Sequence, residues 1–315
     1  MEYGAHLPLI SFQGERRSLA DLLEFTDTAE ETGYDFLAAN DHFIFSRPWL
    51  DGPTALAAVL AKTDRMRLAT TVTIPIVRGL VQTAKTLAAI DLLSAGRLTV
   101  GLGPGSSQRD YDLVGVPFDE RWKRLDEIVP ALRALWDGAA PSVSGQWYDT
   151  ADINLEPHPA QPTGPALWIG SWGTAAGLRR VARLADGWLA SGYNTTPDEF
   201  AEAHRRLQDE LRARGRDAAA FPNAIATMWT YVTEDQREAD RILTDIVAPM
   251  LRRPIEVLAD RLPIGSAESC AAKLAPYAAG GAQRIFIWPI ADEREQLRCF
   301  QEHVVPLINA HVNTP

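Results

Sequence analysis

Residues 91–105 read D-L-L-S-A-G-R-L-T-V-G-L-G-P-G, and this stretch decides the fold class. It predicts the end of a helix, a tight turn at Gly96, a short buried strand, and a loop with glycine at alternate positions. Glycine at such spacing lets the backbone approach a flat ligand, because no Cβ lies between them. In α/β folds ligands bind at the carboxyl ends of strands, so this loop is a candidate site. A glycine-rich turn without a ligand is the alternative interpretation.

The alternation of a short strand with a helix continues along the whole chain. Strands are expected at about 2–7, 35–39, 67–73, 97–101, 166–169, 187–190, 224–231 and 284–288. Helical patterns are expected at about 18–32, 53–62, 80–94, 119–137, 173–184, 197–214, 234–248 and 266–279. This series of βα repeats within 315 residues predicts an α/β protein, a single (β/α)8 TIM-barrel domain over 1–315, rather than an open sheet. Residues 139–164 predict an insertion between units four and five.

The clearest helical pattern covers residues 119–137. Its apolar side chains recur at helical spacing on one face, namely Trp122, Leu125, Ile128, Val129, Leu132, Leu135 and Trp136. Pro130 lies inside the pattern, and proline in a helix interior removes a hydrogen bond and clashes with the preceding turn. The sequence therefore predicts a kink or a break at Pro130.

Composition argues against several classes of protein. The formal net charge of −10 and the pI near 5.1 argue against binding to nucleic acid or to an anionic membrane surface. Cys270 and Cys299 provide no disulfide framework, and the six histidines lack metal-ligand spacing, so we expect no metal. No apolar run reaches the roughly 18 residues that span a bilayer, and residues 1–8 lack the features of a signal peptide. A cytoplasmic location is therefore expected.

Polar, glycine and aromatic residues gather where the predicted strands end. Asp41 and His42 follow the second strand, and Val72 and Thr73 end the third. The other positions follow strands four, five, six and eight: Gly103, Pro104, Gly105, Ser106, Gly170, Ser171, Trp172, Gly173, Thr174, Tyr193 and Trp288. Because the carboxyl ends of all strands meet at one mouth of a TIM barrel, we expect these residues to form the active site.

Each group has a functional interpretation and a structural one. Backbone N–H groups at a helix start, with the hydroxyls of Ser171 and Thr174, suit a phosphate; an ordinary helix cap is the alternative. His42 suits proton transfer near neutral pH, with a structural histidine as the alternative. The third group is aromatic and comprises Trp49, Tyr193 and Trp288. These side chains could form the walls of an apolar pocket for a planar ring, and ordinary core packing is the alternative.

Motifs of other enzyme classes do not occur in the sequence. G-x-S-x-G, H-E-x-x-H and C-x-x-C are all missing. A Schiff-base aldolase on the same barrel would need a lysine at a strand end. The candidates all fall in predicted helices or loops, namely Lys62, Lys85, Lys123 and Lys273.

Four blocks of the sequence resemble a known family. Residues 31–43 read E-T-G-Y-D-F-L-A-A-N-D-H-F, and residues 84–105 read A-K-T-L-A-A-I-D-L-L-S-A-G-R-L-T-V-G-L-G-P-G. R-D-Y-D-L-V-G-V-P-F-D-E-R-W-K-R-L-D-E (109–127) and L-R-R-V-A-R-L-A-D-G-W-L (178–189) follow in the same order. Together they resemble the luciferase-like monooxygenase superfamily. The resemblance implies a TIM barrel that binds FMN or the deazaflavin coenzyme F-420 (F420) at its mouth, acts on a small organic substrate by hydride transfer or oxygen insertion, and pairs as a homodimer.

The resemblance also implies roles for the residues at the strand ends. Asp41 and His42 stand where the family places a histidine that faces the flavin ring and moves a proton. Val72 and Thr73 correspond to a backbone stretch, often a bulge with a non-prolyl cis bond, that supports the ring. The resemblance places the polar edge of the ring along residues 103–106. Ser171 and Thr174 keep the spacing that contacts the flavin phosphate in bacterial luciferase.

Two departures from the family pattern narrow the expected function. Gly103 and Pro104 replace the reactive cysteine and the arginine of bacterial luciferase, which argues against light emission. Ser106 replaces the catalytic glutamate of F420-dependent sugar-phosphate dehydrogenases, which argues against that activity. The compact length favours F420-dependent hydride transfer. The alternatives are an FMN monooxygenase that depends on a separate reductase, and a flavin-binding protein without turnover.

Overall fold

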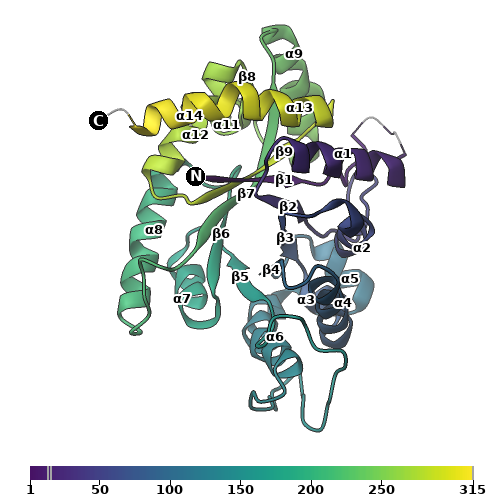
Figure 1. Cartoon of the computed structure of the whole chain (residues 1–315). Coiled ribbons are helices and arrows are strands. Elements are labelled where there is room, and N and C mark those ends of the chain that lie inside the picture. The colour runs from purple at the N-terminus through teal and green to yellow at the C-terminus, as the bar shows by residue number, and fades with distance from the viewer. Residues whose placement is uncertain (13, 15, 314–315) are drawn as a thin grey trace.

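The computed structural model describes residues 1–12, 14 and 16–313, and its centre is a closed parallel barrel (Figure 1). The barrel strands are β1 (Glu2–His6), β2 (Phe36–Ala39), β3 (Arg67–Thr73), β4 (Leu98–Leu102), β5 (Ala166–Gly170), β6 (Gly187–Ser191), β7 (Asn223–Val232) and β9 (Arg284–Pro289). Each pairs in parallel with the next, and β9 closes the ring between β7 and β1. A two-residue strand, β8 (Ile264–Gly265), pairs in parallel with the end of β7. The predicted (β/α)8 barrel is confirmed.

The helices lie outside the ring of strands (Figure 1). The α-helices are α1 (Leu19–Glu31), α2 (Gly52–Ala58), α3 (Pro75–Arg78), α4 (Leu80–Leu93), α5 (Gln108–Val114), α6 (Arg121–Trp136), α7 (Ala175–Leu184), α8 (Pro197–Arg212), α9 (Gln236–Arg241), α10 (Ala248–Leu251), α11 (Ile255–Arg261), α12 (Ala267–Ala279), α13 (Glu293–Cys299) and α14 (Val305–Asn313). Shorter 3₁₀ or π segments are η1 (Leu60–Lys62), η2 (Phe118–Glu120), η3 (Ile242–Val247) and η4 (Phe300–Val304). Capping boxes begin α1 and α8, because Ser18 and Thr196 each exchange hydrogen bonds with the acidic residue three positions later.

The core has two parts. Inside the barrel, a compact apolar group is built from alternate residues of the strands: Phe36, Ala38, Ala69, Trp168, Leu189, Ala224, Ala226 and Phe286. A glycine makes room for one of these rings, since a Cβ at Gly4 would come within 2.2 Å of Phe286 Cδ1. The larger part of the core lies between the outward faces of the strands and the helices. The barrel interior is therefore packed, which makes the mouth at the carboxyl ends of the strands the expected place for a ligand.

The expected break at Pro130 does not occur, because α6 runs unbroken from Arg121 to Trp136. Leu125, Ile128 and Val129 are buried on its inner face, so tertiary packing outweighs the lost backbone hydrogen bond. Two other expected helices are divided: 53–62 becomes α2 and η1, and 234–248 becomes α9, η3 and α10. The helices α3, α5, α11, α13 and α14 are additional to those that the sequence predicted.

The segment between α6 and β5 holds a single isolated bridge, between Ser144 and Asp149. Its turn is fixed by Glu127 of α6, whose carboxylate accepts the backbone N–H groups of Gln146, Trp147 and Tyr148 at 3.1, 2.8 and 2.6 Å. That 139–164 is an insertion, and that 1–315 is a single domain, stay predictions. Within the described residues, no helix is both long and apolar enough to cross a membrane.

Candidate active site

His42 follows β2 at the mouth of the barrel and is held by a buried carboxylate from α5. Its Nδ1 lies 3.2 Å from Oδ2 of Asp110, whose side chain is buried. The other carboxylate oxygen of Asp110 accepts the N–H of Ile44 at 2.8 Å, which fixes the carboxylate. In a neutral ring the proton then resides on Nδ1, so Nε2 is the atom free to accept or return a proton. Asp110 lies in the sequence block 109–127, but no local pattern marks it as a site residue, because its partner His42 is 68 positions away.

Asp41 has a different environment from its neighbour. Its carboxylate accepts two hydrogen bonds from Arg78, at 2.7 Å each from Nε and Nη2, and a third from the N–H of Ile74 at 3.2 Å. The side chain is 1% exposed. These bonds occupy the carboxylate, so Asp41 anchors the end of β2 and Asp110 takes the place beside His42. The predicted catalytic role of Asp41 stays a prediction, and its geometry favours a supporting part.

The end of β3 has the bulge that the family resemblance implied. The Thr71–Val72 peptide bond is cis, and the pairing with β4 shifts register between Thr70 and Thr73. The Val72 side chain then lies beside two glycines: a Cβ at Gly103 would come within 2.7 Å of Val72 Cγ2, and one at Gly170 within 3.2 Å of Cγ1. Strands β3, β4 and β5 therefore bring Val72, Gly103 and Gly170 together at one side of the mouth.

The loop after β4 uses its glycines in two ways. Gly101 allows close contact between strands, because a Cβ there would lie 2.1 Å from the carbonyl oxygen of Thr70. Gly105 has a φ of +73°, which favours glycine, and turns the chain toward α5. The hydroxyl of Tyr111 donates to the carbonyl of Pro104 and so fixes the loop, while Ser106 is exposed. The loop is thus a fixed edge of the mouth beside Val72.

The loop after β5 leads into α7, as the phosphate hypothesis requires. Thr174 caps the helix, since its Oγ1 accepts the N–H of Gly177 at 3.2 Å. Ser171 Oγ lies 3.4 Å from the N–H of Gly173, and the indole of Trp188 fixes the Ser171 carbonyl at 3.0 Å. Trp172 is 55% exposed. The ordinary cap at Thr174 is present, and it is compatible with an anion at the same helix end.

A chain of aromatic rings crosses the other side of the mouth. The His42 ring centroid lies 4.7 Å from that of Trp49, which lies 5.5 Å from that of Trp288. Trp288 is stacked between Trp229 at 4.0 Å and His6 at 3.4 Å. The structure therefore brings together Trp49 and Trp288 of the predicted pocket. In the described part of the chain, Tyr193 makes no ring contact with either.

Buried polar atoms without a partner gather at the mouth. Within the described residues they include His6 Nε2, Asn40 Oδ1, Trp49 Nε1, Thr71 Oγ1, Thr73 Oγ1, Trp229 Nε1 and Trp288 Nε1. All belong to the carboxyl ends of β1, β2, β3, β7 and β9 or to the loop after β2. Buried polar groups normally have hydrogen-bond partners, so this concentration marks a place where a ligand or water completes the site. In the sequence, His6 and Trp229 resemble ordinary strand residues and Asn40 lies directly after a predicted strand, so no local pattern marks these three as site residues.

His6 is a neutral acceptor in this setting. Burial lowers its pKa to about 3, and its Nδ1 lies 2.8 Å from the carbonyl of Leu7. The proton therefore resides on Nδ1, and Nε2 offers a lone pair.

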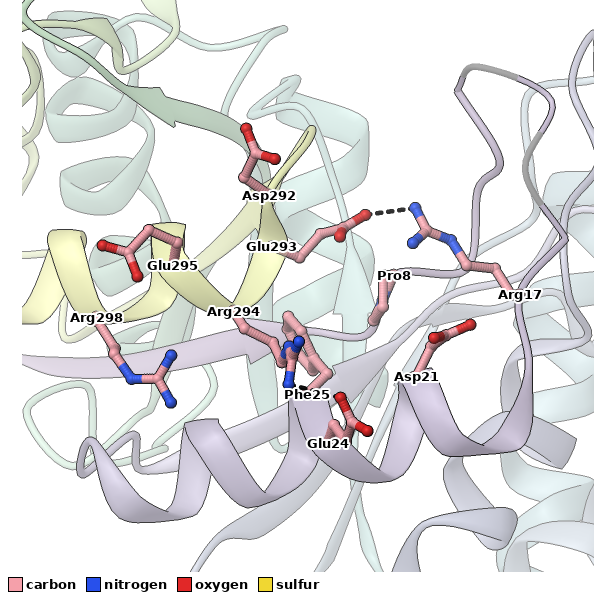
Figure 2. A pocket seen from close by; sticks show the side chains of 10 residues that line it. All are labelled: Pro8, Arg17, Asp21, Glu24, Phe25, Asp292, Glu293, Arg294, Glu295 and Arg298. Carbon is pink, nitrogen blue, oxygen red and sulfur yellow. Dashed lines mark hydrogen bonds and ion pairs between the residues drawn. The ribbon is translucent and has the colours of Figure 1, made fainter.

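A separate hollow of about 450 Å³ lies between α1 and α13 (Figure 2). Acidic and basic side chains line it, and two ion pairs, Arg17–Glu293 and Arg294–Glu24, cross it. None of the predicted site residues line this hollow. Among the described residues, no cluster of three or more His, Cys, Asp and Glu side chains could hold a metal ion. The chemistry therefore concentrates at the barrel mouth.

The barrel and the residues gathered at its mouth define the class: a (β/α)8-barrel protein with a candidate site at the carboxyl ends of its strands. The family model described as luciferase-like monooxygenase matches residues 5–254. The chain belongs to the luciferase-like monooxygenase family, which confirms both the resemblance and the expected class of luciferase-like oxidoreductase or monooxygenase.

Curated relatives agree with this assignment. An uncharacterised protein of Mycobacterium tuberculosis is 35% identical over 179 residues, which cover 57% of this chain and 60% of the relative. The F420-dependent glucose-6-phosphate dehydrogenase of Kribbella flavida is 27% identical over 319 residues, covering 91% of this chain and 94% of the relative. The similarity to the second relative therefore extends over nearly the whole barrel.

Solved structures share the fold at low sequence identity. An F420-dependent secondary alcohol dehydrogenase in complex with an F420–acetone adduct superposes with a TM-score of 0.84 at 18% identity, covering 98% of both chains. The monooxygenase RslO1 of Streptomyces bottropensis superposes with a TM-score of 0.80 at 21% identity, covering 97% of this chain and 99% of the other.

Proposed function

We propose that this protein is an F420-dependent oxidoreductase that transfers a hydride to or from a small organic substrate at the barrel mouth. The observation that carries the proposal is the group of buried polar atoms without hydrogen-bond partners at the barrel mouth, beside the pair formed by His42 and Asp110, which a bound ligand would complete. Gly103 and Gly170 leave room for the Val72 side chain, so the three strand ends that would support the ring pack closely together. The similarity to the Kribbella flavida dehydrogenase supports the deazaflavin as the cofactor.

Two groups of residues at the mouth would hold such a cofactor, one at its ring and the other at its phosphate. The ring would lie along Val72, Thr73 and the loop formed by Gly103, Pro104, Gly105 and Ser106. The phosphate would lie at the start of α7, on the loop formed by Gly170, Ser171, Trp172, Gly173 and Thr174. A deazaflavin supplies or accepts a hydride at its carbon five. The fixed loops of β4 and β5 would hold the reacting groups in near-attack geometry.

The chain's own side chains provide the proton and the walls. Asp110 keeps the proton of the neutral His42 ring on Nδ1, so Nε2 takes a proton from the substrate or, once protonated, returns it. Trp49, Tyr193 and Trp288 would cover the substrate and exclude water. Ser106 stands where sugar-phosphate dehydrogenases of the family carry a glutamate, so we propose a substrate other than a sugar phosphate.

Oxygen insertion with reduced FMN is the second candidate function. The matching family model and the fold likeness to the monooxygenase RslO1 favour it. In that case a separate flavin reductase would be a partner. A homodimer, a cytoplasmic location and the absence of nucleic-acid or membrane partners stay predictions.

The deciding experiment is titration of the purified protein with reduced F420 and with reduced FMN, followed by fluorescence. We expect F420 to bind at least about 100-fold more tightly than FMN, a difference of roughly 2.7 kcal/mol. The opposite order would support the monooxygenase, and binding of neither would overturn the proposed cofactor site. Bound cofactor that a panel of small alcohols and ketones never oxidises or reduces would instead support a flavin-binding protein without turnover.

A further inference from the structure

The loop of residues 42–50, between β2 and α2, carries three side chains of the mouth. His42 begins it, and Phe45 and Trp49 contact the His42 ring at centroid distances of 5.1 and 4.7 Å. An open surface hollow of about 430 Å³ is lined by residues 43–49 themselves. Phe43 is 43% exposed. The loop is therefore partly open to solvent, although it carries the histidine of the site.

Both ends of this loop are bonded to one guanidinium. Asp41 immediately precedes the loop and Asp51 immediately follows it, and Arg78 of α3 donates to both carboxylates. Burial lowers the pKa of Arg78, but its bonds to Asp41 and Asp51 outweigh that effect and raise it, so the side chain stays charged. The planar fork of an arginine can serve two carboxylates in fixed directions, which a lysine cannot do.

The two ends differ in their exposure. Asp41 is 1% exposed and Arg78 15%, whereas Asp51 is 41% exposed. Asp51 also caps α2, accepting the N–H of Thr54 at 3.0 Å. Between these ends, the backbone of the loop is bonded to the rest of the barrel at three described positions. The N–H of Ile44 donates to Asp110 at 2.8 Å, and two further bonds hold Pro48 and Leu50 to the chain after β1, at 3.1 and 2.9 Å.

We propose that Arg78 is a positioning residue that closes the 42–50 loop at both ends and thereby holds His42 toward the mouth. The buried bond with Asp41 fixes the residue before the loop, and the exposed bond with Asp51 fixes the residue after it. The importance of this placement for cofactor binding rests on the proposed function, whereas the anchoring of the loop by Arg78 is independent of that function.

Hydrogen exchange measured by mass spectrometry tests the anchoring on the full-length protein. Asp51→Asn removes the exposed ion pair but keeps a good helix cap, and Arg78→Lys keeps the charge but loses the fork. We expect exchange over 42–50 to become about tenfold faster in both variants, because fewer bonds oppose local opening. The matched control is Asp27→Asn, since Asp27 is also 41% exposed and pairs with Lys62 at 2.9 Å. That control should leave the loop unchanged.

Two further measurements separate positioning from general stability. The double variant should exchange no faster than Arg78→Lys alone, because both changes remove the same contact. Affinity for the cofactor that the unaltered protein binds should fall in Asp51→Asn at an unchanged melting temperature, by no more than the tenfold change in loop opening, because the apparent Kd rises as the binding-competent loop becomes less populated.

Equal loop exchange in Asp51→Asn and Asp27→Asn would overturn the proposal. Faster exchange with unchanged cofactor affinity would overturn the positioning role as well. If the unaltered protein binds neither F420 nor FMN, the proposed function fails, and the exchange rates alone decide whether Arg78 anchors the loop.

Discussion

The two halves of the barrel interior differ in the kind of side chain that they bury. The lower half, farther from the mouth and built around Phe36 and Phe286, is apolar, and these two rings contact each other edge to face at 5.5 Å. The mouth instead holds His6, Thr71 and Trp288, each with a buried polar atom that lacks a partner. Burial without a partner costs free energy, so only the lower half is built for stability alone.

Substitutions in the lower half and at the mouth should therefore affect different properties of the protein. A change in the lower half should alter the free energy of unfolding and leave ligand binding intact at a permissive temperature. A change at the mouth should alter binding or turnover and cost less stability than the loss of a core ring in the lower half. The residues that stabilise the barrel and those of the candidate site thus lie at different depths along the barrel axis, with the site at the carboxyl ends of the strands.

The largest effect is expected for His42→Ala. Loss of a positioned proton-transfer group should slow substrate-dependent reaction of the bound cofactor about 10²- to 10⁴-fold. Single-turnover absorbance traces measure this rate, with thermal melting as the check on stability. His311→Ala, on the exposed surface of α14, is the control. A rate within threefold of the unaltered protein would rule out proton transfer by His42.

Phe286→Ala should show the reverse pattern. Truncating this buried ring should lower the free energy of unfolding by about 3–5 kcal/mol, because a cavity opens in the lower barrel. Urea unfolding measures the loss, and Leu93→Ala, at a position 72% exposed, should cost less than about 0.5 kcal/mol. If Phe286→Ala weakens cofactor binding at a temperature where it stays folded, the two levels are not independent.

Sequence reasoning reached the architecture and part of the site. The strand ends at His42, Thr73 and Gly103 were found because period-two patterns and glycine spacing are local signals. Asp110 and Arg78 were missed because their meaning depends on contacts with residues 68 and 37 positions away. The expected break at Pro130 does not occur for a related reason: packing of α6 on the barrel, which no local pattern contains, keeps the helix continuous, while the alternative of a kink stays a prediction.

His6 links the mouth to stability through pH. Its pKa in the folded protein is lowered from 6.5 to about 3, so the unfolded chain binds the proton first as the pH falls. Stability should therefore decline below pH 6.5 by about 1.4 kcal/mol per pH unit from this group, or about 2 kcal/mol at pH 5. His6→Phe should remove that part of the decline. Urea unfolding at pH 7 and pH 5 measures it, and an equal decline in both proteins would contradict a neutral buried His6.

The smallest effect separates the two interpretations of the α7 start. Thr174→Ala removes the cap to Gly177 and should cost about 1 kcal/mol of stability. If the same helix end also holds the cofactor phosphate, affinity should fall as well, and Thr174→Ser should restore both properties because the hydroxyl returns. Thermal melting and cofactor titration on the two variants measure this. A loss of stability with unchanged affinity would make Thr174 an ordinary cap, and would place the phosphate on other groups of the mouth.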